Sequence, residues 1–347
     1  TGGGNDIVIG GTAQDTITTE SGDDIVLGDS GHATFNSDLD TLSDASHIGI
    51  LRSIETITPE IGDNDTITTD EGDDIILGGQ ANDTITSDSG DDVVLGDNGY
   101  ATFTEAGRLH TISSDLTPRG QDVAATNIGG SDTIETGNGD DIVIAGTATD
   151  YINVHYDPAT NQYTNISDSG NDLLIGDNAT VQFVTSTDED KIETIAFEDG
   201  DADWIHTDSG AEVILGGDGP DYIKTGADTT RDIVLGDNGE ITFKTNNNGR
   251  IDTKRLRLIT SIDTKQNTHE IDNITTGDGN DIVFGGNAAD IINTHGGNNT
   301  VAGDNAKASI DVSITNTDTT YILRSIETIT PEIGDNDTIT TDEGDDI

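Results

Sequence analysis

Aspartate recurs at a fixed place in nine-residue units that repeat through much of the chain. Two such units follow one another in residues 78–95, with Asp83 and Asp92 at the sixth position and Ile85 and Val94 at the eighth. Glycine and small polar residues fill the first half of the units, and glycine allows tight turns with positive φ. The three residues after each aspartate are expected to form a short strand whose middle side chain points inward. Two units then make one turn of a flattened coil, and the aspartates stack in a column along each edge.

Columns of carboxylates need a cation, because like charges one strand apart repel each other. Calcium takes about six to eight oxygen ligands, from carboxylates and from backbone carbonyls in tight turns. A solvated acidic loop would explain a single unit, but it does not explain many units in register. The candidate calcium ligands are the sixth-position aspartates, which are Asp6, Asp15, Asp24, Asp65, Asp74, Asp83, Asp92, Asp132, Asp141, Asp150, Asp172, Asp203, Asp221, Asp232, Asp272, Asp281, Asp290, Asp337 and Asp346.

The overall charge supports the same interpretation. The chain has 347 residues with 68 acidic and 14 basic side chains, a net charge of -54. A chain with this charge and no bound cations would be expanded, and it would be a poor partner for nucleic acid or an anionic membrane. Cysteine is absent, so there is no disulfide framework, and no apolar run is long enough for membrane insertion. Thr1 begins inside a run of repeats and Ile347 stops within one, so we expect a piece of a longer array.

The nonapeptides are grouped in blocks, and an arm without the repeat follows each block. Units of block plus arm are expected at 1–59, 60–126, 127–197, 198–266 and 267–331, with the start of a sixth block at 332–347. An insertion splits the third block between Asn153 and Ser167. Residues 50–75 recur unchanged as residues 322–347, 272 positions later. Such nested periods are typical of proteins that extend by adding blocks.

The last unit of each block keeps the spacing but has no carboxylate at the sixth position. In the first block this unit has Ala33 and Phe35, and we expect it to close the coil with Phe35 pointing inward. The corresponding pairs in the later blocks are Ala101 with Phe103, Val181 with Phe183, Ile241 with Phe243, and Ala308 with Ile310.

Odd and even units differ in the residues beside the inward aliphatic side chain. Even units are apolar at all three strand positions, whereas odd units often read Thr-Ile-Thr. Because side chains alternate across a strand, one sheet of the coil should be apolar on its outer face and need a cover. The arms are the expected cover, with a neighbouring chain as the alternative, and most basic residues lie in or beside them, six of them between Lys244 and Lys265. We therefore expect burial of Ile75, Leu77, Val93 and Leu95 and exposure of Thr66, Thr68, Thr84 and Thr86.

The units GGQANDTIT and SDSGDDVVL resemble the calcium-binding nonapeptide of the RTX, or haemolysin-type, family. The resemblance covers the blocks and not the arms. It implies an all-β fold, a right-handed parallel β-roll with Ca²⁺ between successive turns on each edge, and folding driven by calcium after export from the cell. Glu212 and Asn299 replace the aspartate in two units. By position the resemblance identifies as ligands Asp6, Asp15, Asp24, Asp74, Asp92, Asp141, Asp172, Asp232 and Asp281.

Motifs for other chemistry are weak. Residues 28–31 read GDSG, as in the nucleophile turn of trypsin-type proteases, but the matching turns at 96–99 and 236–239 read GDNG. The serine is therefore one variant of a structural turn. The seven histidines are scattered without a metal-binding spacing, and we expect them at the surface. Trp204 and Tyr222 indicate either a covered part of a sheet or a sugar-binding patch.

Three classes of function remain, and we expect the chain not to be an enzyme. The favoured class is a structural repeat segment of a secreted extracellular fibre, matrix, surface layer or giant adhesin. The alternative is the calcium-folding and secretion module of an RTX enzyme or toxin, and a catalytic domain is the third class. The expected partners are calcium, further copies or blocks along a filament, and cell-surface polysaccharide.

Overall fold

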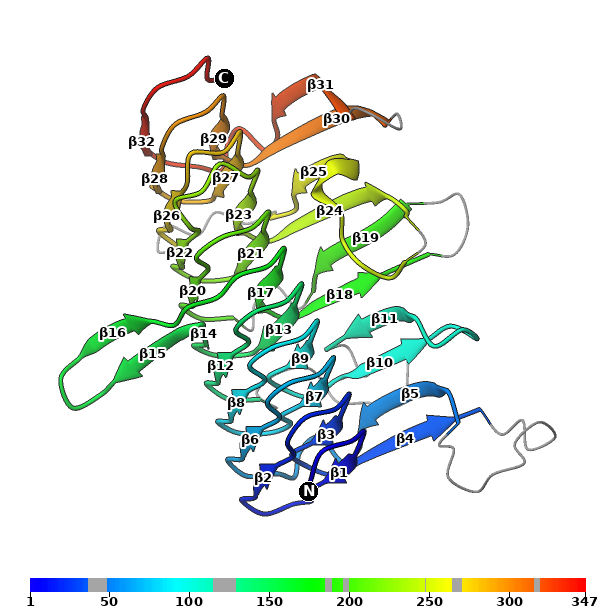
Figure 1. Cartoon of the computed structure of the whole chain (residues 1–347). Helices are drawn as coiled ribbons and strands as arrows, with labels where there is room; N and C mark the ends of the chain where they lie inside the picture. The colour runs from blue at the N-terminus through cyan, green and yellow to red at the C-terminus, as the bar shows by residue number, and fades with distance from the viewer. Residues whose placement is uncertain are drawn as a thin grey trace.

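The computed structural model describes residues 1–36, 49–114, 129–184, 189–195, 200–246, 248–263, 270–314 and 319–347. His47, His269 and Lys265 lie outside these ranges, as do parts of several arms. The described residues form three ten-stranded sheets and a small two-stranded sheet. Figure 1 shows a roll of short strands that runs the length of the molecule, with hairpins stacked along one side of it. The expected all-β parallel roll is confirmed. Among the described residues, no helix is long and apolar enough to cross a membrane.

Sheet A is parallel and is built from the even units, whose branched apolar residues favour strands. Its register pairs equivalent positions in successive turns, for example Val26 with Ile76 and Val94 with Val143. In spatial order its strands are β1 (Ile7–Ile9), β3 (Ile25–Leu27), β7 (Ile75–Leu77), β9 (Val93–Leu95), β13 (Ile142–Gly146), β17 (Leu173–Asp177), β21 (Val213–Gly217), β23 (Ile233–Asp237), β27 (Ile282–Gly286) and β29 (Thr300–Asp304).

Sheet B is also parallel and is built from the odd units on the opposite side of the roll. It pairs equivalent positions in the same way, for example Ile67 with Ile85. Its strands are β2 (Thr16–Thr18), β6 (Thr66–Thr68), β8 (Thr84–Thr86), β12 (Thr133–Glu135), β14 (Tyr151–Ile152), β20 (Trp204–His206), β22 (Tyr222–Lys224), β26 (Asn273–Thr276), β28 (Ile291–Thr294) and β32 (Thr338–Thr341).

Sheet C is antiparallel and consists of the arms, each of which is a β-hairpin. Neighbouring hairpins also pair with each other, as β10 does with β5 and β11 with β18, so the five hairpins make one continuous sheet. Its strands are β4 (Gly31–Phe35), β5 (Leu51–Thr56), β10 (Tyr100–Phe103), β11 (Leu109–Ser113), β18 (Ala179–Gln182), β19 (Glu189–Thr194), β24 (Gly239–Lys244), β25 (Leu256–Ser261), β30 (Ala306–Ile314) and β31 (Thr319–Thr328). A short 3-10 helix, η2 (Thr253–Arg255), precedes β25.

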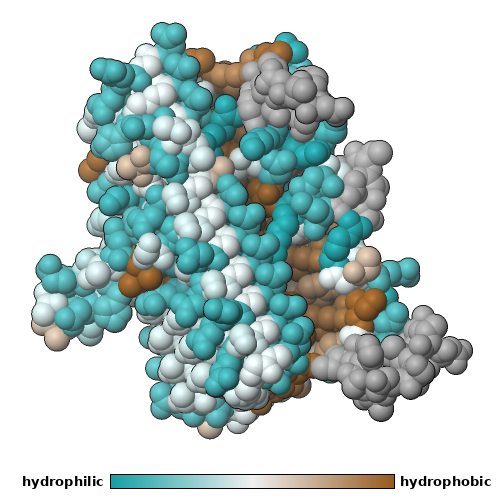
Figure 2. Space-filling model, in the orientation of Figure 1, coloured by the Kyte–Doolittle hydropathy of each residue, from teal (hydrophilic) through white to brown (hydrophobic). Residues whose placement is uncertain are grey.

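Two apolar layers share sheet A. The inner layer lies between sheets A and B and contains the eighth-position side chains, such as Val94 and Ile85. The outer layer lies between sheets A and C and joins side chains such as Leu95 to Ile112 and Phe243 of the hairpins. In Figure 2 the hydrophobic surface gathers in the seam between the roll and the hairpins.

The structure confirms the prediction that the arms cover the even face. Leu77, Val93 and Leu95 are buried and Ile75 is half-buried against the same core. On the open face of sheet B, Thr66 and Thr84 are exposed, whereas Thr68 and Thr86 are intermediate.

The predicted closing units are wrong as turns of the roll. Phe35 and Phe103 lie in β4 and β10, the first strands of hairpins. Of the matching residues, Phe243 and Ile310 lie in β24 and β30, and Phe183 directly follows β18. The chain leaves the roll here at a small residue, which is glycine in three blocks and alanine (Ala179, Ala306) in two. A Cβ atom on Gly99 would lie 2.1 Å from the Leu95 side chain, because the hairpin strand passes directly over sheet A.

The insertion in the third block forms the hairpin β15 (Val154–Asp157) and β16 (Gln162–Asn165), which projects from the roll in Figure 1. Tyr163 of this hairpin stacks on Trp204 with ring centroids 4.8 Å apart, and Trp204 stacks on Tyr222 at the same distance. Trp204 is therefore half-buried beneath Tyr163, in agreement with the covered-sheet interpretation, whereas Tyr222 is 44% exposed and is not covered.

Candidate metal centres

One carboxylate column lies directly before the strands of sheet A, and we call it the A-edge column. The backbone N–H of most members donates a hydrogen bond to a side-chain oxygen of the member in the next turn. Asp74 N donates to Asp92 Oδ1 over 2.9 Å, and Asp92 N donates to Asp141 Oδ1 over 2.8 Å. The column contains Asp6, Asp24, Asp74, Asp92, Asp141, Asp172, Glu212, Asp232, Asp281, Asn299 and Asp346.

A second column lies directly before the strands of sheet B, and we call it the B-edge column. Its ladder has the same form: Asp65 N donates to Asp83 Oδ1, and Asp83 N donates to Asp132 Oδ1, both over 2.7 Å. The column contains Asp15, Asp65, Asp83, Asp132, Asp150, Asp203, Asp221, Asp272, Asp290 and Asp337. The predicted stacking of sixth-position aspartates along both edges is therefore present, and their role as ligands stays a prediction.

In most members of both columns the second carboxylate oxygen is buried without a hydrogen-bond partner. Examples are Oδ2 of Asp74, Asp92 and Asp203. An isolated buried anion costs free energy, so such an oxygen needs either a proton or a cation. Burial raises the pKa of Asp92 to about 8 and that of Asp290 to about 8, although hydrogen bonds to their oxygens act in the opposite direction. The buried orphan oxygens fit hard oxygen coordination of Ca²⁺.

The glycine turns bring carbonyl oxygens to the same places. A Cβ on Gly96 would lie 2.4 Å from Asp132 Oδ2 and 2.5 Å from the carbonyl oxygen of Ala145. On the other edge, Gly90 has φ of 138°, and a Cβ there would lie 1.8 Å from the carbonyl oxygen of Gly72. Any side chain at these positions would fill the space between oxygens of successive turns. The glycines thus leave each edge lined by carboxylate and carbonyl oxygens, the donor set that calcium prefers.

One cluster adds a carboxylate that the nonapeptide pattern did not reveal. Carboxylate oxygens of Asp141, Asp168 and Asp172 all lie within 4.8 Å of one another, and all three residues are buried. Burial, and then the charge of Asp168, raise the pKa of Asp172. Asn153 donates from Nδ2 to Asp168 Oδ2 over 3.0 Å, which holds Asp168 at the point where the chain returns from the insertion.

The end turns of the stack are more open than the middle. Asp6, Asp15, Asp337 and Asp346 are only half-buried, because each has a neighbouring turn on one side. The most enclosed carboxylates therefore lie in the middle of the columns.

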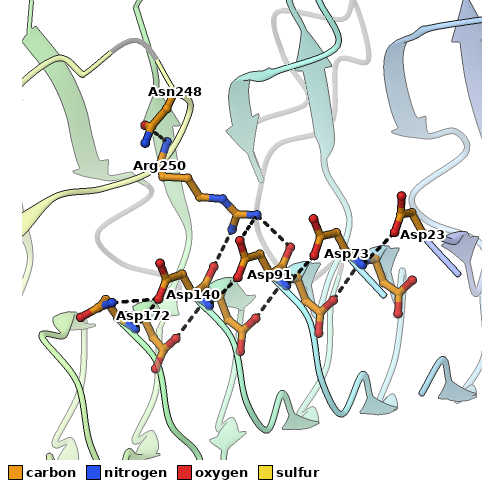
Figure 3. A network of polar contacts seen from close by, with 11 residues as sticks. Asp23, Asp73, Asp91, Asp140, Asp172, Asn248 and Arg250 are labelled. Carbon is orange, nitrogen blue, oxygen red and sulfur yellow. Dashed lines mark hydrogen bonds and ion pairs between the residues drawn. The ribbon is translucent and has the colours of Figure 1, made fainter. Parts of the chain in front are cut away.

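A third, outer row of acidic residues lies beside the A-edge column at the fifth position of the units. Asp91 N donates to Asp73 Oδ1 and Asp140 N to Asp91 Oδ1. Figure 3 shows Arg250, from the loop between β24 and β25, reaching this row. Its guanidinium lies 2.9 Å from Asp91 Oδ2 and donates to the carbonyl oxygens of Asp91 and Asp140. Arg250 thus fulfils the expectation that basic arm residues contact the acidic roll.

The fold and these columns define a calcium-binding parallel β-roll. A family model of the RTX calcium-binding nonapeptide repeat matches residues 1–35, 62–100, 128–154, 199–223, 206–240 and 270–301, about half of the chain. The chain belongs to this RTX family and is a calcium-binding structural repeat module. No curated protein matches the chain. RTX repeat proteins are typically secreted.

Proposed function

We propose that this chain is a non-catalytic, load-bearing segment of an extracellular array: a fibre, matrix, surface layer or giant adhesin. The observation that supports this best is the placement of the recurring 26 residues. Leu51–Thr56 forms β5, the return strand of the first hairpin, and the identical residues 323–328 lie in β31, the return strand of the fifth. The same sequence therefore takes the same place in the stack four blocks later.

A solenoid whose repeats contact only their neighbours can be lengthened without redesign of its core. All three long sheets run through the successive blocks, so load along the axis would be shared by sheets A, B and C. Calcium in the two columns would neutralise part of the net charge of -54 and hold successive turns together. Because calcium is scarce inside cells and abundant outside, stiffening would follow export.

Imaging of the native material tests this proposal. We expect filaments or layers with an axial repeat set by the blocks, and we expect them to dissolve when a chelator removes calcium. A soluble monomeric product that carries an enzymatic activity would contradict the proposal and favour a calcium-folding secretion module. Cell-surface polysaccharide binding would be measured separately, with the calcium-bound chain on glycan arrays.

A further inference from the structure

Five aspartates outside the nonapeptide pattern lie where the chain leaves the roll for a hairpin, and we call them junction carboxylates. Each follows a sheet A strand or ends it, in the turn whose sequence is GDS or GDN. They are Asp29, Asp97, Asp177, Asp237 and Asp304.

Asp177 and Asp237 are almost completely buried, with 3% and 2% of their surface exposed. One oxygen of each accepts a backbone N–H from the next turn of the roll: Asp218 N donates to Asp177 over 2.5 Å, and Asn287 N donates to Asp237. The other oxygen, Oδ1, is buried and has no hydrogen-bond partner in either residue. The third and fourth junctions therefore each leave one buried carboxylate oxygen without a donor.

The surroundings of these oxygens are shaped by glycine. A Cβ on Gly200, where the chain returns to the roll, would lie 1.9 Å from Asp177 Oδ2, and one on Gly217 would lie 2.3 Å from the same atom. Gly286 has the corresponding place beside Asp237, at 2.4 Å. The carboxylates of Asp177 and Asp237 thus lie directly against glycine backbone, where a side chain would not fit.

Further acids surround both groups. The charges of Asp221, Asp218 and Asp201 act on Asp177, and those of Asp272, Asp263 and Glu270 act on Asp237. Around Asp177 these acids come from the B-edge column, from the next turn and from the returning chain. Around Asp237 they come from the B-edge column, from the end of the hairpin and from the returning chain. A single monovalent side chain would not neutralise such a group, whereas a divalent cation would.

The second junction gives an internal contrast. Asp97 is as deeply buried, but both of its oxygens have donors: Gly130 N to Oδ1 over 2.8 Å, and Thr147 N and Oγ1 to Oδ2 over 2.6 and 2.8 Å. Thr147 occupies the position that Asp218 has at the third junction. In the returning segment, Gly130 occupies the position that Asp201 has there. At the fourth junction the neutral residue Asn287 takes the place of Thr147, so the second junction differs in the Gly130 N–H, which satisfies Oδ1 of Asp97.

We propose that the junction carboxylates Asp177 and Asp237 each hold a divalent cation of the calcium type, which fastens a hairpin to the roll, and that Asp97 does not. This proposal rests on the calcium-binding function of the roll and adds sites outside its two columns. It means that calcium joins sheet C to the roll as well as joining successive turns.

Equilibrium dialysis of the whole chain against calcium, with metal counted by mass spectrometry, tests the proposal. We expect Asp177→Asn to bind one ion fewer than the unchanged chain, and Asp97→Asn to bind the same number. Equal loss in Asp177→Asn and Asp97→Asn, or no loss in Asp177→Asn, would overturn the proposal while leaving the calcium requirement of the roll intact.

A second measurement uses the unchanged chain and so does not depend on the variants folding. Anomalous difference maps from crystals grown with calcium should show a peak beside Asp177 and beside Asp237 and none beside Asp97. Peaks confined to the two columns would refute the junction sites. A chain that bound no calcium at all would instead refute the proposed function on which the junction sites rest.

Discussion

The two apolar layers on either side of sheet A are held in different ways. The outer layer, between sheets A and C, contains large side chains such as Leu95, Phe243 and Phe284, and it is an ordinary hydrophobic core. The inner layer, between sheets A and B, contains one aliphatic side chain per strand, such as Val94 or Ile85. The carboxylate columns lie in the turns at the two edges of this inner layer.

This difference separates two sources of stability. Burial of apolar surface stabilises the outer layer whether or not metal is present. The inner layer can form only if the buried carboxylates beside it are neutralised, because unpaired buried charges cost several kcal/mol each. Calcium binding and folding of the roll are therefore linked, as in other proteins whose metal sites exist only in the folded state.

Removal of calcium should have the largest effect and should act on the roll first. In excess chelator we expect the β-sheet signal in circular dichroism to collapse and the amides of sheets A and B to exchange rapidly with solvent. Magnesium at the same concentration should not restore the signal fully, because it demands a smaller, octahedral site. An unchanged spectrum in chelator would show that the inner layer does not need metal.

The effect of pH should reverse when calcium is removed. Without metal, burial raises the pKa of Asp92 to about 8 and that of Asp281 to about 7 in the folded chain. Groups with a raised folded pKa favour folding below their unfolded pKa of about 4, and this contribution is lost as pH rises through 7 to 8. In chelator we therefore expect the β signal to recover on acidification towards pH 4.

With calcium bound, the same carboxylates must be ionised, so acidification should release metal and lower stability. The measurement is a pair of pH titrations followed by circular dichroism, one in chelator and one in calcium. Parallel curves in the two titrations would contradict the link between the columns and the inner layer.

Truncation of a side chain in the outer layer should lower the free energy of unfolding by a moderate amount. This loss does not depend on the coordination of calcium. Leu95 is 1% exposed, and Leu95→Ala should lower the free energy of unfolding in calcium by about 2–5 kcal/mol. Thr84→Ala, on the open face of sheet B, is the matched control and should change it by less than about 0.5 kcal/mol. Urea unfolding measures both. Similar costs for the two variants would mean that the hairpins do not protect sheet A.

The sequence predicted the columns and the covered face because both depend on local periods. Nine-residue spacing places Asp74 beside Asp92, and alternation across a strand places Leu95 outward. The sequence did not reveal that the hairpins pair with one another, because this pairing is not local: β11 and β18 join residues 67 positions apart. The prediction for Phe35 was wrong because its unit keeps the nonapeptide spacing, although the chain already enters the first hairpin at Gly31.

Two groups of acids could not be recognised from the repeat either. Asp168 is drawn into its cluster by the path of the insertion, which no repeat register describes. The junction carboxylate Asp237 occupies a position where the nonapeptide has glycine, and the turn at 236–239 was interpreted as purely structural. Its recurrence in every block was the available signal.

The smallest expected effect concerns Arg250, whose ion pair with Asp91 joins the hairpin sheet to the outer acidic row of the roll. Arg250 is 26% exposed and pairs with Asp91, which is 42% exposed, so solvent screens the interaction. Arg250→Ala should lower the free energy of unfolding in calcium by about 1 kcal/mol or less, and the loss should shrink in high salt. Arg324→Ala is the control, because Arg324 pairs with Asp311 within the fifth hairpin and touches neither column in that pair. Hydrogen exchange at the turns that contain Asp91 and Asp140 should rise in Arg250→Ala and not in Arg324→Ala. An equal rise in both variants would mean that the bridge to the roll adds nothing beyond ordinary surface charge, and that the outer layer alone holds the hairpins in place.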